Sequence, residues 1–329
     1  MSRLRIVGYA LGAALVAVIV WRLDLEGVWR VLRETEAGWA VLALLLNLPI
    51  AVLIGGRSRL VLRRLGYELH GSLLLSTAML GYVLGSVTPA GSGDLLRAKL
   101  LRDRADVSIS HGVALVAFER ALSFFLLTLT TGASLLLVVT PVAAWPAVFV
   151  LTGLGCLAPW LAAARFAAPR PRPAGDGLLA RGGRYVLETA SQLRALSADA
   201  GLLLSWSAVS IAVFVLMGLQ VLLLARSVSA DIGLHEAWLA YGGSTLAIIV
   251  TFLPLGAGIG DGSLAALLHQ MGLSLEQGTA VAVLVRGTIT LPLVVAAAAA
   301  YVPLALRRAA PPAAAGHAIE DPAGGVGPD

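Results

Sequence analysis

The sequence predicts an all-α fold: a polytopic transmembrane helical bundle with two opposed re-entrant hairpins built from broken helices. Three observations predict it, namely the composition, the recurrence of apolar segments long enough to cross a bilayer, and a repeat around two Pro/Gly-rich breaks. Of the 329 residues, 58% are hydrophobic and 13% are charged, whereas soluble domains carry about 25% charged residues. Most of the surface is therefore expected to face lipid.

Eight apolar segments are candidates for crossing or entering the membrane, since a span needs about 20 predominantly apolar residues. They are Leu4–Trp21, Gly38–Ile54, Ser72–Thr88, Gly112–Val139, Val142–Ala163, Ala200–Ala225, Ala237–Phe252 and Ala280–Leu306. We predict one membrane domain over residues 1–308, interrupted by a cytoplasmic loop at 164–199. The tail over 309–329 is rich in Ala, Pro and Gly and is predicted to be disordered.

The basic residues orient the chain, because cytoplasmic loops carry an excess of Arg and Lys. The Arg57–Arg64 cluster and the Arg165–Arg194 loop are therefore predicted to be cytoplasmic, as are both termini, and the uncharged turn Pro141–Pro146 faces outward. Within the basic loop, Ala167–Gly183 is predicted to be flexible. Tyr185–Leu196 is predicted to form an interfacial helix with Val186, Leu193 and Leu196 on one face. Almost all basic residues are Arg, which suggests a GC-rich bacterial genome and hence the bacterial inner membrane.

This orientation leaves two segments that each begin and end on one face of the membrane. Gly71–Ser110 must start and finish in the cytoplasm, and Ala237–Gly278 must start and finish outside. Each is therefore predicted to be a re-entrant hairpin, with breaks at Pro89–Gly93 and Pro254–Gly260. Unwound backbone at membrane depth is tolerated only where protein buries it or where it lines a wet cavity, so the breaks indicate a cavity.

The two breaks belong to a sequence repeat. From Pro89 to Arg120 the spacing is 31 residues (89 to 120), and from Pro254 to Arg286 it is 32 (254 to 286). Two copies in opposite orientations are typical of an inverted repeat, in which substrate sites lie near the bilayer midplane.

Arg120 and Arg286 lie inside apolar runs, where a charge costs about 2.5–3.5 kcal/mol on insertion scales, so each needs a partner. One interpretation is a lipid phosphate, which a guanidinium group binds well; the other is a structural ion pair with Asp94, Glu119 or Asp261. The two aspartates follow glycines at helix starts, where an N-cap role is favoured over a ligand role. Glu119 and Arg120 point about 100° apart on a helix, so each is expected to reach another helix.

The chain resembles the transmembrane domain of lysylphosphatidylglycerol synthases and its stand-alone flippase-like relatives, over roughly Arg5 to Leu306. The motifs that carry the resemblance are Thr88-Pro89, Gly93-Asp94 with Arg97, Phe118-Glu119-Arg120, Leu253–Asp261 and Arg286. Asp94 and Asp261 stand where the family pattern more often has Glu. The resemblance implies binding or translocation of a polar-headed lipid: a phospholipid, an aminoacyl-phospholipid, a glycolipid or a polyprenyl-linked lipid. The chain ends soon after its last predicted helix, so synthase activity is not expected.

The leading hypothesis is flippase-like binding or translocation of an anionic lipid. The alternatives are a non-transporting lipid-binding or scaffold partner of an envelope lipid enzyme and, third, an intramembrane enzyme acting on lipid-linked sugars. No catalytic triad or paired-carboxylate pattern stands out, and no enzyme activity, cofactor, metal site or nucleic-acid partner is expected. No P-loop is present, so energy coupling would need a gradient or a partner. The candidate substrate-binding residues are Pro89, Gly93, Asp94, Arg97, Glu119, Arg120, Pro254, Gly258, Gly260, Asp261 and Arg286.

Overall fold

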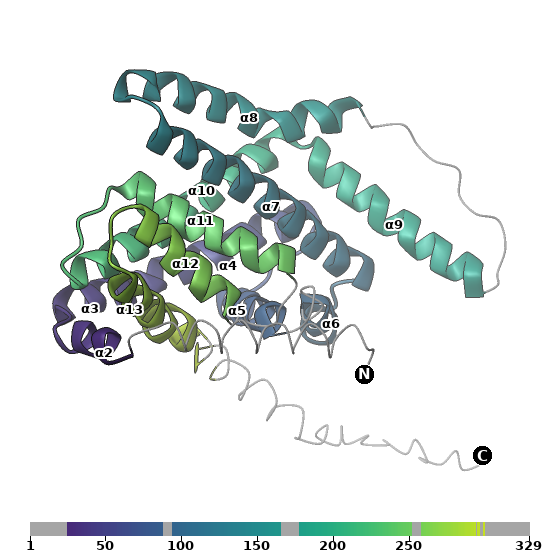
Figure 1. Ribbon diagram of the computed structural model, residues 1–329. Coiled ribbons are helices and arrows are strands. Elements are labelled where there is room, and N and C mark those ends of the chain that lie inside the picture. Colours follow the sequence, from purple (N-terminus) through teal and green to yellow (C-terminus); the bar gives the residue numbers. More distant parts are fainter. Residues whose placement is uncertain are drawn as a thin grey trace, which may run out of the picture.

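The computed structural model describes residues 25–87, 94–165, 178–251 and 258–293, together with 295, 296 and 299. Throughout these residues the regular structure is helical and contains no strand (Figure 1). The predicted all-α fold is therefore confirmed for this part of the chain. The predicted helix Leu4–Trp21, the break residues Pro89, Gly93 and Pro254, and the predicted tail lie outside the described residues.

The helices follow one another with short connections. They are α2 (Leu25–Arg33), α3 (Ala37–Leu45), α4 (Asn47–Arg64), α5 (Gly71–Val87), α6 (Asp94–Ala105), α7 (Ile109–Val139), the 3₁₀ turn η2 (Val142–Ala144), α8 (Trp145–Arg165), α9 (Leu178–Ala198), α10 (Ala200–Ser227), α11 (Leu234–Thr251), α12 (Ile259–Gln270), α13 (Leu275–Val285) and the π-helix η4 (Arg286–Thr290). Three stretches are long and apolar enough to cross a membrane: Ala37–Arg64, Ile109–Val139 and Ala200–Ser227. The protein is thus a membrane protein.

Three predicted boundaries were wrong. Helix α4 continues to Arg64 instead of ending near Ile54, because Ser58, Val61 and Leu62 are buried on one face, while Arg59, Arg63 and Arg64 are exposed. Helix α9 begins at Leu178, inside the segment predicted to be flexible; Leu196 is buried against the bundle, but Val186 is 65% exposed and lies off that face. Helix α13 begins at Leu275 rather than at Ala280.

Prolines interrupt two of the apolar helices. Pro49 lacks a backbone N–H and its ring conflicts with the carbonyl four residues earlier, and the helix is interrupted at Leu46. Pro292 likewise cannot donate a hydrogen bond to the carbonyl of Thr288, four residues earlier. At this point the chain forms the π-helix Arg286–Thr290. Each interruption leaves a carbonyl group that needs a donor from outside its own helix.

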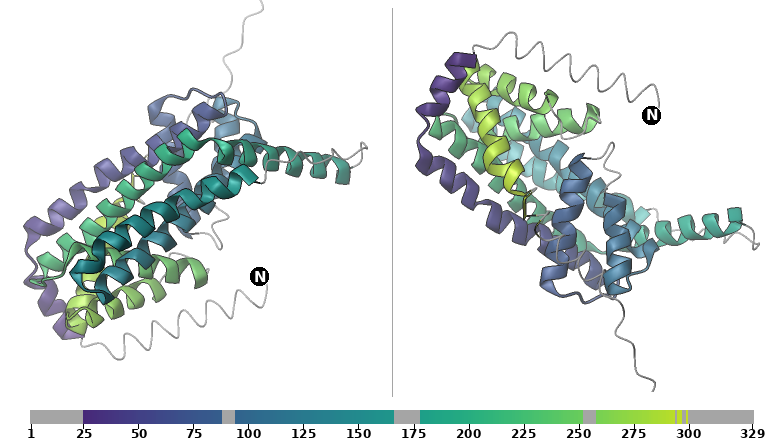
Figure 2. Two further views of the ribbon diagram at one scale, coloured as in Figure 1. Left: turned by 90° about the horizontal axis from the view of Figure 1, so that it is seen from above. Right: turned by 90° about the horizontal axis from the view of Figure 1, so that it is seen from below.

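Helix α10 lies at the centre of the packed helices and contacts α3, α4, α7, α11 and α13. Three clusters of buried apolar residues surround it, and Tyr241 of α11 borders all three. Helices α5 and α6 pack on each other, as do α11 and α12. Figure 2 shows α9 extending away from this bundle, although its C-terminal part packs against α7.

Two glycines allow close approach of helices that carry the charged residues. A Cβ atom on Gly112 of α7 would lie 2.9 Å from the Cα of Ala98 on α6. A Cβ atom on Gly278 of α13 would lie 2.8 Å from the carbonyl oxygen of Ala265 on α12. Both distances are too short for a real side chain, so the two helix pairs, α6 with α7 and α12 with α13, depend on glycine at these positions.

Candidate functional site

The first charge centre lies where α4, α6, α7 and α10 meet, and we define it by Arg57, Ser58, Arg97, Glu119 and Trp206. Arg97 donates from Nη1 to Glu119 Oε2 at 2.6 Å, and their side chains are only 7% and 8% exposed. Ser58 donates its hydroxyl to the other carboxylate oxygen of Glu119, with Oγ and Oε1 2.7 Å apart. Both carboxylate oxygens are therefore hydrogen-bonded, as burial of a charged group requires.

Arg57 adds a second guanidinium group to this centre. Its Cζ atom lies 5.2 Å from the centroid of the Trp206 ring, within the range of a cation–π interaction. Trp206 is completely buried and meets Phe118 edge to face, with the ring centroids 5.8 Å apart. Four buried nitrogen atoms of the centre have no hydrogen-bond partner among the described residues, namely Nε of Arg57, Nε and Nη2 of Arg97, and Nε1 of Trp206. The centre therefore contains two guanidinium groups, one carboxylate and unused donors.

The second charge centre joins α12 to the start of the π-helix. Arg286 binds Asp261 with two parallel hydrogen bonds, Nε to Oδ1 at 2.7 Å and Nη2 to Oδ2 at 3.0 Å. The side chains are 32% and 36% exposed. Asp261 was predicted to cap the helix as its N-cap residue; the N-cap of α12 is Gly258, and Asp261, in the first turn, caps the helix by accepting the N–H of Gly258 at 3.3 Å. Oδ2 of Asp261 therefore accepts from both the N–H of Gly258 and Nη2 of Arg286.

Glycines shape the start of α12. Gly258 has a φ of +81°, in the left-handed region that favours glycine. A Cβ atom on Gly260 would lie 2.5 Å from Cδ1 of Ile248 on α11, and 4.0 Å from Nη2 of Arg286. The sequence Gly258-Ile-Gly260-Asp261 thus lets α12 lie close to α11 with its carboxylate beside Arg286.

An amide network connects the two proline-interrupted helices. Asn47 donates from Nδ2 to the carbonyl of Thr288 at 2.7 Å, which provides the donor that Pro292 cannot supply. Gln220 of α10, completely buried, donates to the carbonyl of Ala43 at 2.9 Å and to Oδ1 of Asn47 at 3.2 Å. Because Arg286 is the first residue of the π-helix, this network also fixes the turn that carries Arg286.

The structure thus brings four of the predicted site residues together in two pairs, Arg97 with Glu119 and Asp261 with Arg286. Glu119 reaches another helix, as expected. The side chain of Arg120, the next residue of α7, is exposed and is not part of the Arg97–Glu119 contact. The side chain of Asp94 lies outside the described part of the structure.

Sequence reasoning missed Arg57, Ser58 and Trp206 of the first centre, and it did not predict the contacts of Asn47 and Gln220. Arg57 was assigned to a basic loop, although its helical spacing from the apolar residues Ile54 and Val61 places it near the buried face of α4. That periodicity was the available signal. A lone Gln within the 28-residue apolar helix α10 was a second signal, because buried amides need partners.

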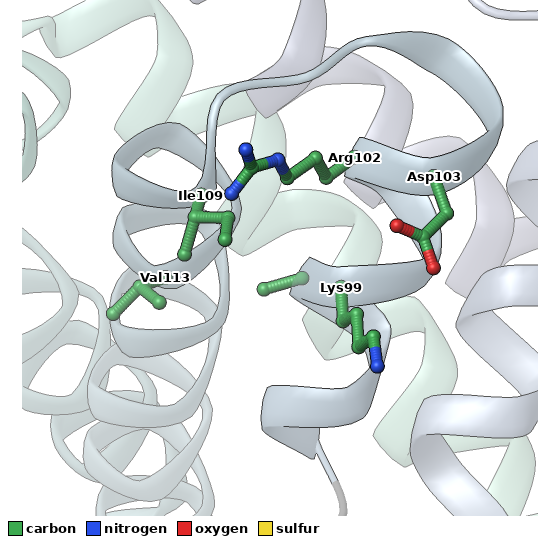
Figure 3. Close-up of a pocket in the computed structure, with 6 residues that line it drawn as sticks. Lys99, Arg102, Asp103, Ile109 and Val113 are labelled. Carbon is green, nitrogen blue, oxygen red and sulfur yellow. The ribbon is translucent and has the colours of Figure 1, made fainter.

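An open hollow lies between α6 and α7, with a volume of about 510 Å³. Figure 3 shows Arg102 extending toward Ile109, while Lys99 and Asp103 project from the outer side of α6. Lys99 is about 200° around the helix from Arg97, so this hollow is separate from the first charge centre. Its charged residues are exposed and form part of the surface of the protein.

Comparison with known proteins gives one family. Residues 5–297 match the family model described as the lysylphosphatidylglycerol synthase TM region, and this match covers most of the chain. A search of curated proteins gives no match.

Proposed function

Because the chain belongs to the family of lysylphosphatidylglycerol synthase transmembrane regions, we propose that it binds a polar-headed anionic lipid and translocates it across the bacterial inner membrane. The family relates the protein to membrane lipids, and the charge centres supply the further argument. The buried Arg97–Glu119 pair carries the proposal. A charged pair among apolar spans is costly to insert, and such residues commonly mark substrate pathways.

The packing of the helix pairs supports an inverted repeat. On the first helix of each pair, an alanine lies four residues after an aspartate. This alanine contacts a glycine on the second helix, and an arginine lies eight residues after that glycine. The equivalent residues are Asp94, Ala98, Gly112 and Arg120 in one unit and Asp261, Ala265, Gly278 and Arg286 in the other. Under the proposal, these units are the opposed re-entrant hairpins, and both termini are cytoplasmic.

The proposed mechanism exchanges the partners of arginine side chains. In the lipid-free protein, Glu119 and Asp261 neutralise Arg97 and Arg286. An arriving headgroup offers phosphate oxygens to the same donors, while its acyl chains stay in the surrounding lipid. Movement of the two units against each other would then carry the headgroup between the faces of the membrane. No covalent step is involved.

Headgroup movement in proteoliposomes tests this function. Purified protein is reconstituted with headgroup-labelled phosphatidylglycerol, and the loss of label from the outer leaflet is followed after addition of an impermeant quencher. We expect the wild type to accelerate movement over protein-free vesicles, and Arg97→Gln to abolish the acceleration. Arg102→Gln removes the same charge from an exposed position on the same helix and should behave like the wild type.

Other outcomes identify the alternatives. A wild type that binds the labelled lipid without moving it would contradict translocation and favour the lipid-binding or scaffold partner. A chemically altered lipid in the same vesicles, detected by mass spectrometry, would instead indicate an enzyme.

A further inference from the structure

We infer that Arg57 and Arg97 form a binding site for a phosphate group at the first charge centre, and that Glu119 occupies this site in the ligand-free protein. The inference rests on the proposed function and deepens it, since it names the part of the lipid that is recognised and the residues that recognise it. Arg57 has no assigned role in the sequence motifs, which begin after it in the chain.

The argument starts from unused hydrogen-bonding capacity. Nε of Arg57 and Nε and Nη2 of Arg97 are buried without partners among the described residues, although nearly all buried polar groups in proteins are hydrogen-bonded. Glu119 has only two oxygen atoms, and both are already bound, one by Arg97 and one by Ser58. A phosphate group has more acceptor oxygens than a carboxylate and matches the fork geometry of guanidinium groups.

The net charge of the first centre also favours the binding of an anion. Among the described residues that define the centre, two guanidinium groups face one carboxylate, since Trp206 and Ser58 carry no charge. The surplus positive charge lies among apolar spans, where an uncompensated charge is costly. An anion that enters the centre would remove this surplus, whereas a neutral or cationic group would not.

The repeat carries apolar residues at the positions of Arg97 and Glu119 in its second unit. Position for position, Arg97 corresponds to Leu264 on α12, and Glu119 corresponds to Val285 on α13. The second unit therefore builds the same glycine-mediated helix contact with apolar residues at both places. The second unit has its charged pair at Asp261 and Arg286 instead, so the Arg97–Glu119 pair is specific to the first unit.

Arg286 and Asp261 of the second charge centre have no buried side-chain atom without a hydrogen-bond partner among the described residues. Arg286 already uses Nε and Nη2 in its two bonds to Asp261, and the pair is neutral. At the first centre, by contrast, the Trp206 ring holds the guanidinium group of Arg57 near the donors of Arg97. Arg57 is therefore proposed as a binding residue and Trp206 as the residue that positions it.

The test measures ligand binding by the full chain in detergent, using thermal stabilisation and isothermal titration. The probes are inorganic phosphate, dihexanoylphosphatidylglycerol, and dihexanoylglycerol, which has no phosphate. We expect Arg57→Gln to lower the affinity for the phosphate-bearing probes at least about tenfold, since a charge-assisted hydrogen bond is lost. Arg59→Gln is the matched control, because Arg59 lies on the same helix and is exposed; it should bind like the wild type.

A second variant keeps the inference testable if Arg57→Gln does not fold. Glu119→Gln keeps the side-chain shape but removes the charge that competes for the site, so it should bind the phosphate-bearing probes more tightly than the wild type. If inorganic phosphate binds, the centre accepts free phosphate. If only the phospholipid binds, the site recognises a lipid headgroup. Equal stabilisation by dihexanoylglycerol would overturn the inference, as would wild-type affinity in Arg57→Gln or weaker binding in Glu119→Gln.

The outcomes separate this inference from the proposed function. If the wild type binds phosphatidylglycerol in an Arg57-dependent way but moves no headgroup in vesicles, translocation fails and the site stands. If Arg57→Gln moves headgroups at the wild-type rate, the site fails and translocation stands.

Discussion

The contact between α6 and α7 at Gly112 should control the geometry of the first charge centre. A Cβ atom at this position would lie 2.9 Å from both Cα and Cβ of Ala98, and ordinary contacts begin at 3.4 Å. Gly112→Ala therefore requires the helices to separate by about 0.5 Å, the difference between these distances. Because Ala98 follows Arg97, this movement also lengthens the 2.6 Å contact with Glu119, and hydrogen bonds weaken as they lengthen.

The size of the effect follows from two opposing terms. Overpacking a close contact costs about 1–3 kcal/mol, whereas replacing Gly by Ala inside a helix gains up to about 1 kcal/mol in helix propensity. Gly132 lies on the same helix, and a Cβ atom added there would meet no atom within 4 Å. Gly132→Ala should therefore show only the stabilisation that comes from the higher helix propensity of Ala. The stability of the two variants should then differ by about 1–3 kcal/mol, with Gly112→Ala the less stable.

The assay compares both variants by unfolding in detergent, followed by tryptophan fluorescence, and by titration with dihexanoylphosphatidylglycerol. We expect Gly112→Ala to unfold more readily than Gly132→Ala and to bind the lipid more weakly than the wild type. Equal stability of the two variants would refute the reasoning, because the Ala98 contact would then impose no steric constraint. Reduced stability with unchanged lipid binding would separate the helix contact from the charge centre.

Three further predictions concern other parts of the molecule. The backbone N–H of Leu202 and the guanidinium group of Arg64 hold the pKa of Asp199 below its usual value. The stability that Asp199 contributes is therefore present above its unfolded pKa, about 3.9, and is lost as the pH falls through the lower folded value. In acid unfolding, Asp199→Asn should lose less stability over that pH range than the wild type. Gln220→Leu removes two amide hydrogen bonds from the network and should lower stability by about 1–3 kcal/mol, measured by thermal unfolding against Gln220→Glu, which retains acceptor oxygens but lacks the donor. Finally, a cysteine introduced by Arg102→Cys should react with an impermeant thiol reagent only from the cytoplasmic side, and labelling from outside would contradict the first hairpin.

The apolar helices were predictable because the bilayer restricts the choices. Backbone groups in lipid must be satisfied within the chain, so a long apolar segment has to be helical. The segment predicted as Gly112–Val139 is observed as Ile109–Val139, and the segment predicted as Ala200–Ala225 is observed as Ala200–Ser227. The helix interruption near Asn47 was predictable for an equally local reason, the missing N–H of Pro49.

The charge pairs were less predictable because they depend on how helices are rotated against each other. Glu119 and Arg120 are adjacent in the sequence, yet Glu119 is buried and pairs with Arg97, while Arg120 is exposed. Glu119 rather than Arg120 faces Arg97 because the α6–α7 contact at Gly112 turns one face of α7 toward Arg97. Arg57 was assigned to a loop because charge was taken as evidence against the membrane interior, whereas Trp206, far away in the sequence, gives its guanidinium group a buried aromatic partner.

The two centres share a backbone arrangement but differ in the number of existing hydrogen bonds that must break when a phosphate group binds. At the second centre, Asp261 already binds two of the three guanidinium nitrogen atoms of Arg286, so a phosphate that replaces Asp261 gains bonds that are offset by bonds that are lost. At the first centre, three guanidinium nitrogens have no partner to lose among the described residues, and the surplus charge falls when the anion enters. Under the proposed function, the initial affinity for the headgroup is therefore set at Arg57 and Arg97. Arg286 takes part only once a movement has released it from Asp261, which would give translocation a fixed order of contacts.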